Sequence, residues 1–306
     1  KIYVYAILSQ EVKMNGIIIV NAYAKSKTEL NQALRLKEEL EILGVIIQII
    51  PTDELSVIIY NGTIVNDLVN IDFCIYLDKD KHLLEKLEKL NIKLFNKASA
   101  IEICDDKLLT HIMLSNNNIP MPKTIGGVLC YYPDAKVKKS ILDKVEKELS
   151  YPVIIKESYG SCGKSVYLAK NRLELEQIAD NVKLKPHIFQ EFIKESSGTD
   201  TRVIVIGGKF IGAMCRQNTN DFRSNIELGG NGYKAQLTAA QIALCQNVAK
   251  TLNLDYCGID LLTNKNNQPL VCEVNSNAFF GMFESITKIN VAKLYSKYII
   301  EKVNNQ

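Results

Sequence analysis

Two carboxylates and an amide interrupt apolar segments near the C-terminal end of the chain. Asp260 lies in CGIDLL, and Glu273 and Asn275 lie in LVCEVN. Residues i and i+2 of a strand face the same side, so Glu273 and Asn275 point together, away from Val274. If the two segments pair through a turn at residues 264–267, Asp260 joins them. An all-oxygen set of this kind predicts a Mg²⁺ site completed by phosphate oxygens, whereas the alternative is a solvent-facing strand side.

A glycine-rich stretch, YPVIIKESYGSCGKSV at residues 151–166, ends like a nucleotide-binding P-loop. The P-loop pattern has its first glycine where this chain has Ser158. The stretch also leads into SVYLA, a β-branched and aromatic run typical of a strand, whereas a P-loop opens a helix. It therefore predicts strand, loop and strand, with backbone N–H groups in the loop that can cover phosphates. An ordinary hairpin with glycines at its turn is the alternative.

Basic residues accompany this loop and a later segment. Lys156 projects from the apolar run VIIKE, and Lys107 lies on a predicted helix before the loop. Each suits a phosphate as a point charge, although each alone is also typical of a surface lysine. Arg216 and Arg223 in RQNTNDFRSN add two guanidinium groups, which are natural partners of phosphate or carboxylate oxygens. A charged surface loop is the alternative for this segment.

The segment IFQEFIKESSGTDTRVIVIGG, residues 188–208, has features of a nucleotide-binding edge. Its portion Gln190-Glu191-Phe192-Ile193 can offer backbone N–H and C=O groups to an adenine while apolar side chains pack against the ring. Asp200 and Arg202 then point to one side of the next strand. Together with the preceding segments, it supplies nucleotide, phosphate, metal and anion contacts in one continuous order.

Alternating strands and helices precede these segments. Apolar strands are predicted at residues 17–20, 45–50, 73–77 and 92–95, with a helix over residues 28–43 that Gly44 ends. This pattern predicts a small parallel α/β domain over residues 1–98. It lacks the G-x-G-x-x-G fingerprint that a Rossmann oxidoreductase would carry. Residues 1–13 fit an N-terminal extension or an extra edge strand, and their apolar part is too short for a signal peptide.

The remainder divides into two predicted units. A central unit, residues 99–185, begins with a helix over residues 100–116 and holds the glycine-rich hairpin and two charged helices. A C-terminal unit, residues 186–306, mixes strands and helices. Its strands are predicted at residues 202–206, 209–214, 258–262 and 270–274, and its helices at 239–252 and 289–302. The fold class is therefore α/β with some α+β character.

Composition limits the function classes. The chain has 306 residues, 47% of them hydrophobic, which suffices for one large or two to three small domains. The formal charge of +3 indicates no nucleic-acid partner, and no apolar run is long enough to span a membrane. The eight cysteines are scattered without a C-x-x-C pair, as reduced thiols of a cytoplasmic protein are. The three histidines lack metal-type spacing, so the chemistry rests mainly on Lys, Arg, Asp, Glu and Asn.

The chain resembles the ATP-grasp superfamily, and within it the RimK-type ligases, which attach glutamate or similar amino acids to a carboxylate acceptor. The resemblance covers about residues 95–303. It rests on DFRSN followed by GG at 221–230, together with QEFIKE, GIDLL and EVN in the same order. It implies an ATP-grasp fold, with a small parallel α/β N-terminal domain and a two-lobed ATP-binding region.

The resemblance also implies roles for the matching residues. The loop Ser158–Lys164, with Gly160, Ser161 and Gly163, would be a flap over the phosphates. The other implied ATP contacts are Lys107 and Lys156 at the phosphates, Gln190, Glu191, Phe192 and Ile193 at the adenine, Asp200 at the sugar and Asn225 at the phosphates or the acyl-phosphate. Arg202 and Arg223 are the predicted catalytic residues, which stabilise the developing oxyanion. Asp260, Glu273 and Asn275 would hold two Mg²⁺ ions, with Mn²⁺ as an alternative ion.

The implied reaction has two steps. A substrate carboxylate attacks the γ-phosphate of ATP, giving an acyl-phosphate and ADP, and an amine then displaces phosphate to form an amide. Glutamate or another amino acid is the expected amine, and a peptide, protein or small-molecule carboxylate is the expected acceptor. The run EVNSNAFFGMFE lacks the Pro-Gly turn that many ATP-grasp enzymes carry here, which leaves the acceptor open. The alternatives are a ligase for macrocyclic amides or esters and an ATP-binding module without turnover; a homo-oligomer is compatible with each.

Overall fold

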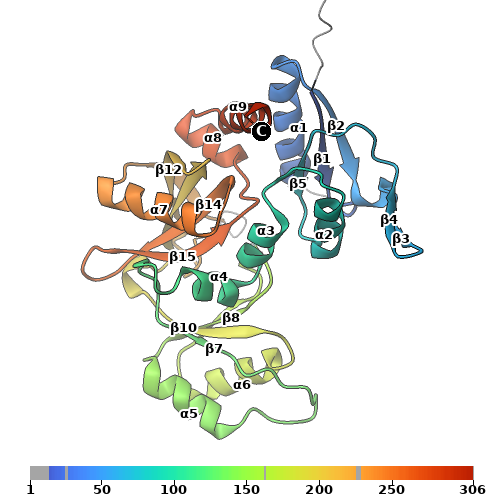
Figure 1. Ribbon diagram of the computed structural model, residues 1–306. Helices are drawn as coiled ribbons and strands as arrows, with labels where there is room; N and C mark the ends of the chain where they lie inside the picture. Colours follow the sequence, from blue (N-terminus) through green and yellow to red (C-terminus); the bar gives the residue numbers. More distant parts are fainter. Residues whose placement is uncertain (1–13, 25–26, 162, 225–228, 306) are drawn as a thin grey trace, which may run out of the picture.

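The computed structural model of the chain describes residues 14–24, 27–161, 163–224 and 229–305. Figure 1 shows an N-terminal sheet at the upper right, a C-terminal sheet at the upper left and a lower lobe beneath them. Within these residues the strands form three larger sheets and one two-stranded hairpin. The predicted edge strand or extension at residues 1–13 lies outside the described residues.

The N-terminal sheet is parallel, as predicted, with the order β2-β1-β5-β6. Its residues form β1 (Asn15–Val20), α1 (Lys27–Ile42), β2 (Ile46–Pro51), the 3-10 turn η1 (Thr52–Glu54), β5 (Phe73–Leu77), α2 (Lys81–Lys89) and β6 (Leu94–Phe95). Nearly continuous apolar strands are expected here because helices cover both faces. Ile18 and Val20 pack with α1, whereas Ile17 and Ile19 pack with α2.

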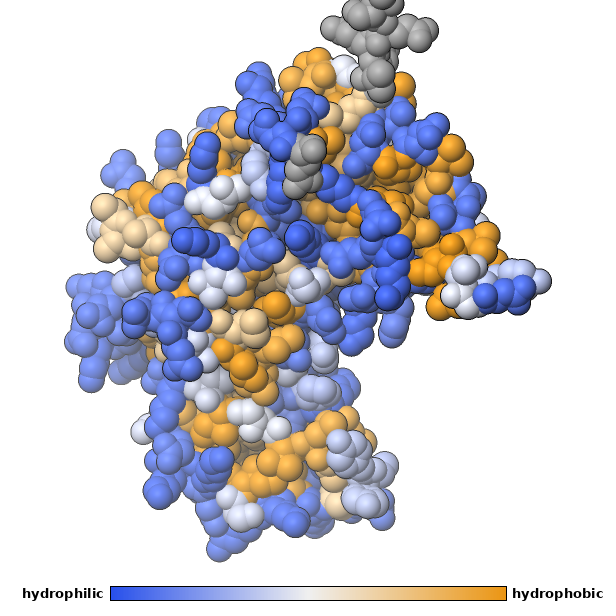
Figure 2. All heavy atoms as spheres, viewed as in Figure 1, coloured by the Kyte–Doolittle hydropathy of each residue, from blue (hydrophilic) through white to orange (hydrophobic). Residues whose placement is uncertain are grey.

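A hairpin that the sequence did not predict projects from the N-terminal region. It consists of β3 (Val57–Tyr60) and β4 (Thr63–Asn66). Figure 2 shows hydrophobic side chains gathered where this hairpin projects, and Ile58, Ile59, Tyr60 and Val65 are all exposed. The hairpin therefore contributes little to the core that supports the sheets.

The lower lobe is an antiparallel sheet with the order β7-β10-β8-β9. Its elements are β7 (Thr124–Gly126), α5 (Lys139–Glu148), β8 (Val153–Glu157), β9 (Val166–Ala169), α6 (Arg172–Val182) and β10 (His187–Glu191). The β8–loop–β9 arrangement confirms the predicted strand, loop and strand. Ile155 and Phe189 pack with α5 and α6, so the alternate residues Lys156 and Gln190 face away from these helices.

The C-terminal sheet is antiparallel, with the order β13-β12-β11-β14-β15. Its region comprises the 3-10 turn η2 (Lys194–Ser196), β11 (Thr199–Ile206), β12 (Lys209–Gln217), β13 (Asn231–Ala235), α7 (Ala239–Thr251), β14 (Tyr256–Thr263), β15 (Pro269–Asn275), α8 (Gly281–Thr287) and α9 (Val291–Asn304). One face packs on α7, and part of the other face packs on α8 and α9. The uncovered part of that second face carries the charged residues discussed below.

The single helix predicted over residues 100–116 is wrong, because two helices occupy this region. They are α3 (Ala98–Asp105) and α4 (Lys107–Leu114). Asp106 between them is extended, and its carboxylate accepts the backbone N–H groups of Leu108 and Leu109 at 2.9 and 3.2 Å. An aspartate in this position caps the second helix. The break places Lys107 at the start of α4, beside the glycine-rich loop.

Two expectations from the composition concern the state of the cysteines and the presence of membrane-spanning helices. The seven cysteines that the structure describes are free, and five of them are buried. This confirms the prediction of reduced thiols for those seven, while Cys162 lies outside the described residues. No described helix combines the length and the apolar content that a membrane crossing requires.

Asn96 joins the N-terminal sheet to the C-terminal sheet. Its amide Nδ2 donates to the carbonyl oxygens of Tyr256 and Ser276 at 2.8 and 3.0 Å. Its Oδ1 accepts from the backbone N–H groups of Asp255 and Tyr256 at 2.6 and 3.1 Å. The side chain is buried, so these four backbone groups have no access to water as a replacement partner.

We expect Asn96→Ala to lower the free energy of unfolding by roughly 2–4 kcal/mol, because buried backbone donors and acceptors are left unpaired. Urea unfolding followed by circular dichroism measures this change. Asn266→Ala is the matched control, since Asn266 is exposed and its side chain makes no hydrogen bond with the described residues. Equal stability of the two variants would contradict the role assigned to Asn96.

Candidate functional site

A pocket lies between the lower-lobe sheet and the C-terminal sheet. Most residues that the sequence analysis assigned to ATP and metal line it: Lys107, Lys156, Gly160, Ser161, Gly163, Gln190, Glu191, Phe192, Ile193, Asp200, Arg223, Asp260 and Glu273. Arg202 and Asn275 are not among its lining residues, and Arg202 is linked to it through Asp260. Asn225 lies outside the described residues. The structure thus brings together segments that are distant in the sequence.

Pairing of β14 with β15 places the predicted metal ligands. Asp260 lies opposite Glu273, and Asn275 lies opposite Gly258, with the turn at residues 264–267 closed by Asn264 and Gln268. The register shifts beside Asp260, because Leu261 pairs with Val271 and leaves Cys272 as a bulge. The bulge lets Val271 and Val274 both enter the core while Cys272 and Glu273 line the pocket. The predicted strand pairing is confirmed, but the bulge was not foreseen.

Alternating charges fill the uncovered part of the C-terminal sheet face. Arg202 forms a two-point ion pair with Asp260, with Nη2 and Oδ2 2.8 Å apart. Arg216 lies 2.9 Å from Asp260 Oδ2 and donates from Nε to Asp200 Oδ1 at 2.7 Å. Ser224 also donates to Asp200. The side chains of both arginines and both aspartates are at most 12% exposed, so this Arg–Asp network is largely shielded from water.

Burial and pairing set the charge states in the Arg–Asp network. Burial opposes ionisation of Asp260, but Arg202 and Arg216 outweigh it, so the pKa of Asp260 lies below its usual value. Burial and the charge of Asp260 raise the pKa of Asp200, although Arg216 and Ser224 act in the opposite direction. Burial disfavours the charged form of Arg216, yet the two aspartates raise its pKa above the ordinary value. Arg216 therefore holds both carboxylates in place.

The sequence marked Arg216 as a possible partner of phosphate or carboxylate oxygens but gave it no defined site role, although its strand carried a usable signal. It follows the apolar run GAMC in β12, just as Asp260 interrupts the apolar run of β14. A charge inside a buried strand requires a partner. The register Asp200–Arg216 and Arg202–Asp260 supplies those partners, and it confirms that Asp200 and Arg202 point to one side.

The glycine-rich loop is held over the pocket by two predicted phosphate-binding residues. Lys107 donates from Nζ to the carbonyl oxygen of Gly160 at 2.8 Å. Arg223 donates from Nη1 to the carbonyl oxygen of Gly163 at 2.8 Å. Gly160 and Gly163 have φ angles of +133° and +69°, which glycine adopts without a steric penalty. The loop and both cations are thus positioned together at the rim.

A buried hydrogen-bond chain extends behind Lys156. Its Nζ donates to Gln190 Oε1 at 2.7 Å and lies 3.5 Å from Cys272 Sγ. Gln190 Nε2 donates to Thr124 Oγ1 at 2.8 Å, and His111 Nδ1 lies 3.4 Å from that hydroxyl. Burial and the charge of Lys156 lower the pKa of His111 to about 4, against a smaller raising effect of a hydrogen bond from the imidazole to the Cys272 backbone. His111 is therefore neutral at physiological pH.

The expected adenine edge differs in part from the prediction. β10 is an inner strand between β7 and β8, so Gln190 and Glu191 use their backbone within the sheet. The Gln190 side chain contacts Lys156 instead, as described above. Phe192 and Ile193 follow the strand and line the pocket, so their side chains are available to pack against a planar ring. The difference arises because β7, a short strand, adds to the side of β10 that was expected to be open.

The donor set at the end of β15 fits a hard divalent cation. Glu273 lines the pocket and forms no hydrogen bond or ion pair with the described residues. Asn275 Nδ2 is buried without a hydrogen-bond partner among the described residues. If the Asn275 amide group is rotated by 180°, its oxygen takes this position and is free to bind a cation. Asp260 already forms ion pairs with Arg202 and Arg216, so it could contribute to a metal site only as a ligand beside Glu273 and Asn275. Among the described residues, no three His, Cys, Asp or Glu side chains are arranged so that they could hold a metal ion together, so phosphate oxygens would have to complete the shell.

Comparisons with known proteins identify the family of the chain. The family model of the RimK-like ATP-grasp domain matches residues 104–299. Human N-acetylaspartylglutamate synthase A is 35% identical over 231 residues, which cover 75% of this chain and 58% of the human protein. A probable alpha-L-glutamate ligase of Marinomonas sp. is 34% identical over 220 residues, covering 71% of this chain and 70% of that protein. The chain thus spans less than two thirds of the human relative.

A solved structure shares the fold. The ATP-grasp ligase PsnB, complexed with a phosphomimetic variant of its minimal precursor, Mg and ADP, superposes with a TM-score of 0.67 at 16% identity. The superposition covers 94% of this chain and 98% of PsnB. The predicted ATP-grasp fold is therefore confirmed for the chain as a whole.

We expect Lys156→Met to raise the pKa of His111 from about 4 toward its ordinary value of 6.5, because a nearby positive charge is removed. NMR titration of the imidazole signals measures this change. Lys250→Met is the control, since Lys250 is exposed on α7. An unchanged His111 titration in Lys156→Met would contradict the buried chain described above.

The same shift makes stability depend on pH. The unfolded chain binds a proton at His111 below about 6.5, whereas the folded chain binds it only near 4, so folding stability decreases as the pH falls through this window. His111→Gln should remove this part of the pH dependence of urea unfolding.

Proposed function

The chain belongs to the RimK-like ATP-grasp family, and we propose that it is an ATP-dependent ligase that joins a carboxylate to an amine through an acyl-phosphate. The pocket supports the proposal, because it combines cations suited to phosphate, a buried Arg–Asp network and the carboxylate of Glu273, which has no partner among the described residues. The relatives with glutamate in their names make glutamate or another amino acid the proposed amine. A peptide, protein or small-molecule carboxylate is the proposed acceptor.

Nucleotide binding in this proposal uses both walls of the pocket. Lys156 and Lys107 bind phosphate oxygens as point charges, and the loop Ser158–Lys164 covers them with backbone N–H groups. Phe192 and Ile193 pack against the adenine. Lys107 and Arg223, which bind loop carbonyl oxygens in this structure, exchange these contacts for phosphate. Asp200 lies at the sugar side, held by Arg216.

Glu273 and Asn275 are the proposed principal Mg²⁺ ligands, with Asp260 sharing an ion. Mg²⁺ supplies charge neutralisation at the phosphate oxygens when it is bound. These three side chains suffice for one ion. The proposal also includes a second ion, and Mn²⁺ as an alternative to Mg²⁺. Glu273 has no competing partner among the described residues, so its carboxylate is ready to bind a cation.

Charge that develops on the reacting carbonyl oxygen requires fixed donors. Arg202 and Arg223 are the proposed catalytic residues: Arg223 lines the pocket and contacts the glycine-rich loop, and Arg202 is linked to the pocket through its ion pair with Asp260. Arg216 is a positioning residue that orients Asp260, and through it Arg202. Preorganised cations of this kind stabilise a transition state without reorganising during the reaction.

Three further assignments belong to the proposal. The proposed structural units are residues 1–98, 99–185 and 186–306. The proposed location is the cytoplasm, and the proposed assembly is a homo-oligomer. A ligase for macrocyclic amides or esters would join other substrates, with a hydroxyl group in place of the amine for an ester. The proposed place of discrimination is near residues 276–284, where Ala278 and Phe280 are buried and Phe279 is exposed.

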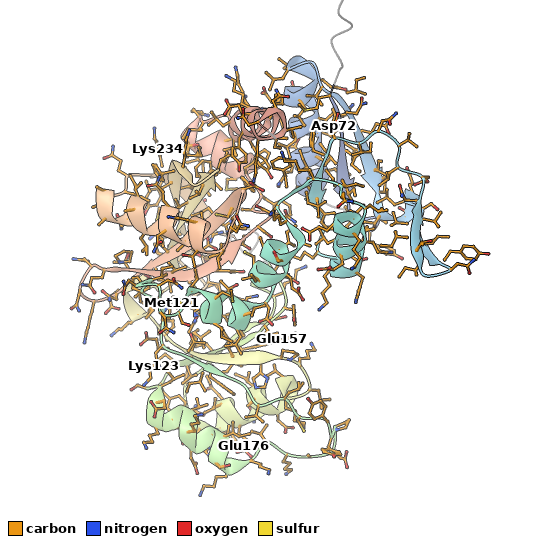
Figure 3. All side chains as sticks on the ribbon, viewed as in Figure 1. Asp72, Met121, Lys123, Glu157, Glu176 and Lys234 are labelled. Atoms are coloured by element: carbon orange, nitrogen blue, oxygen red, sulfur yellow. The ribbon has the colours of Figure 1, made fainter. Side chains whose placement is uncertain are left out.

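We expect Glu273→Gln to lower ADP release at least about a hundredfold, because a Mg²⁺ ligand at the phosphates is lost. A coupled assay with ATP, Mg²⁺, L-glutamate and a panel of carboxylates measures the release, and mass spectrometry identifies the amide. Glu176→Gln is the matched control, because Glu176 is exposed on α6 in the lower lobe (Figure 3). Turnover retained in Glu273→Gln would remove the metal assignment. Nucleotide binding without ADP release for any pair in the wild type would favour the ATP-binding module.

A further inference from the structure

Thr124 lies directly behind the residues that are proposed to bind the nucleotide phosphates. It is the first residue of β7, and it pairs with Gln190 of the adjacent strand β10 (Figure 1). Ile125, the next residue, packs toward α5 and α6, so the Thr124 side chain faces the opposite side of the sheet, together with that of Gln190. Thr124 is not among the described residues that line the pocket, so any effect on a bound nucleotide must pass through a neighbouring side chain.

The single proton of the Thr124 hydroxyl group is directed to the backbone. Thr124 Oγ1 donates to the carbonyl oxygen of Pro122 at 2.9 Å, whereas His111 Nδ1 is farther away, at 3.4 Å. Toward Gln190 the hydroxyl group can therefore only accept, and Gln190 Nε2 donates to it at 2.8 Å. This contact fixes the Gln190 amide with its nitrogen toward Thr124 and its oxygen toward Lys156.

The oriented amide supplies the oxygen acceptor of Lys156. Ile188 lies opposite Lys156 of β8, and Gln190 is two residues further along β10, a diagonal position that a long side chain reaches. Lys156 is buried, forms no ion pair with the described residues and donates from Nζ to Gln190 Oε1 at 2.7 Å. The reversed amide would present its NH₂ group to this buried cation and leave it without the oxygen acceptor, which is unfavourable. An ammonium group has three donors, so one can bind Gln190 while others bind phosphate oxygens.

We propose that Thr124 is a positioning residue for the phosphate-binding Lys156. Its hydroxyl group orients the Gln190 amide, and the Gln190 oxygen holds the Lys156 ammonium group at the pocket wall. Thr124 therefore contributes to nucleotide affinity without touching the nucleotide. The inference rests on the proposed function, because that proposal assigns the triphosphate to this pocket and to Lys156.

Calorimetric binding of AMPPNP with Mg²⁺ tests the proposal without turnover. We expect Thr124→Val, which keeps the size of the side chain, to weaken AMPPNP binding about fivefold or more, because the hydroxyl acceptor for Gln190 is lost. Thr124→Ser retains the hydroxyl group, so its affinity should stay within about twofold of the wild type. Thr63→Val is the matched control and should bind AMPPNP as the wild type does, since Thr63 is exposed on β4, in the hairpin outside the pocket.

A second background separates positioning of Lys156 from a general structural effect. In Lys156→Met the ammonium group is absent, so the addition of Thr124→Val should change AMPPNP affinity by less than about twofold. If Thr124 only stabilised the lower lobe, the loss caused by Thr124→Val would persist in this background.

The outcomes distinguish this inference from the ligase proposal. Unchanged AMPPNP affinity in Thr124→Val overturns the positioning role and leaves the ligase proposal standing, and so does a loss that persists in Lys156→Met. Thr124→Ser binding as weakly as Thr124→Val also overturns it, because the hydroxyl group is then not the cause. If Lys156→Met binds AMPPNP like the wild type, Lys156 makes no phosphate contact and the inference fails. A wild type that does not bind AMPPNP contradicts the ligase proposal itself.

Discussion

Charges of opposite sign on a buried sheet face are the constraint on which the site depends. Asp200, Arg216, Asp260 and Arg202 alternate in space, and removal of one partner from such a set typically costs about 3–5 kcal/mol. Each side chain is placed by strand register, because Asp200 pairs with Arg216 and Arg202 pairs with Asp260 across adjacent strands. The hydrophobic packing of α7 on the opposite face fixes that register. The polar site is therefore a consequence of the apolar core behind it.

The lower lobe supplies the second wall with different chemistry. Its side chains are lysine and amide groups backed by the neutral His111, and its loop offers glycine backbone. Excess positive charge gathers at the rim, where Lys107 and Arg223 meet loop carbonyl oxygens. A triphosphate would meet this wall first and the paired charges of the other sheet second. In the proposed ligase, the lower-lobe wall would bind the anionic phosphates, and the C-terminal sheet would hold the metal ion and the reacting carbonyl group.

Much of the fold and of the candidate site could be predicted from local pattern. Carboxylates inside apolar strands marked Asp260 and Glu273, and β-branched flanks marked the glycine-rich loop as a hairpin. Two of the failed predictions depended on contacts between distant segments, and a third was local. The bulge at Cys272 allows both Val271 and Val274 to pack into the core. β10 is an inner strand because the three-residue strand β7 pairs with it. The break at Asp106 was readable as a capping residue, but the apolar pattern on both sides concealed it.

The packing between the N-terminal and C-terminal sheets determines which part can move. Ile18 and Phe73 share one core with Tyr256, Tyr295 and α9, and Asn96 adds buried hydrogen bonds across the same boundary. The lower lobe joins this body at residues 115–123 and 192–198. Lys123 and Glu191 lie beside these connections and exchange hydrogen bonds of 2.7 and 2.9 Å. A rotation of the lower lobe about these two connections would change the width of the pocket, because the pocket lies between that lobe and the C-terminal sheet.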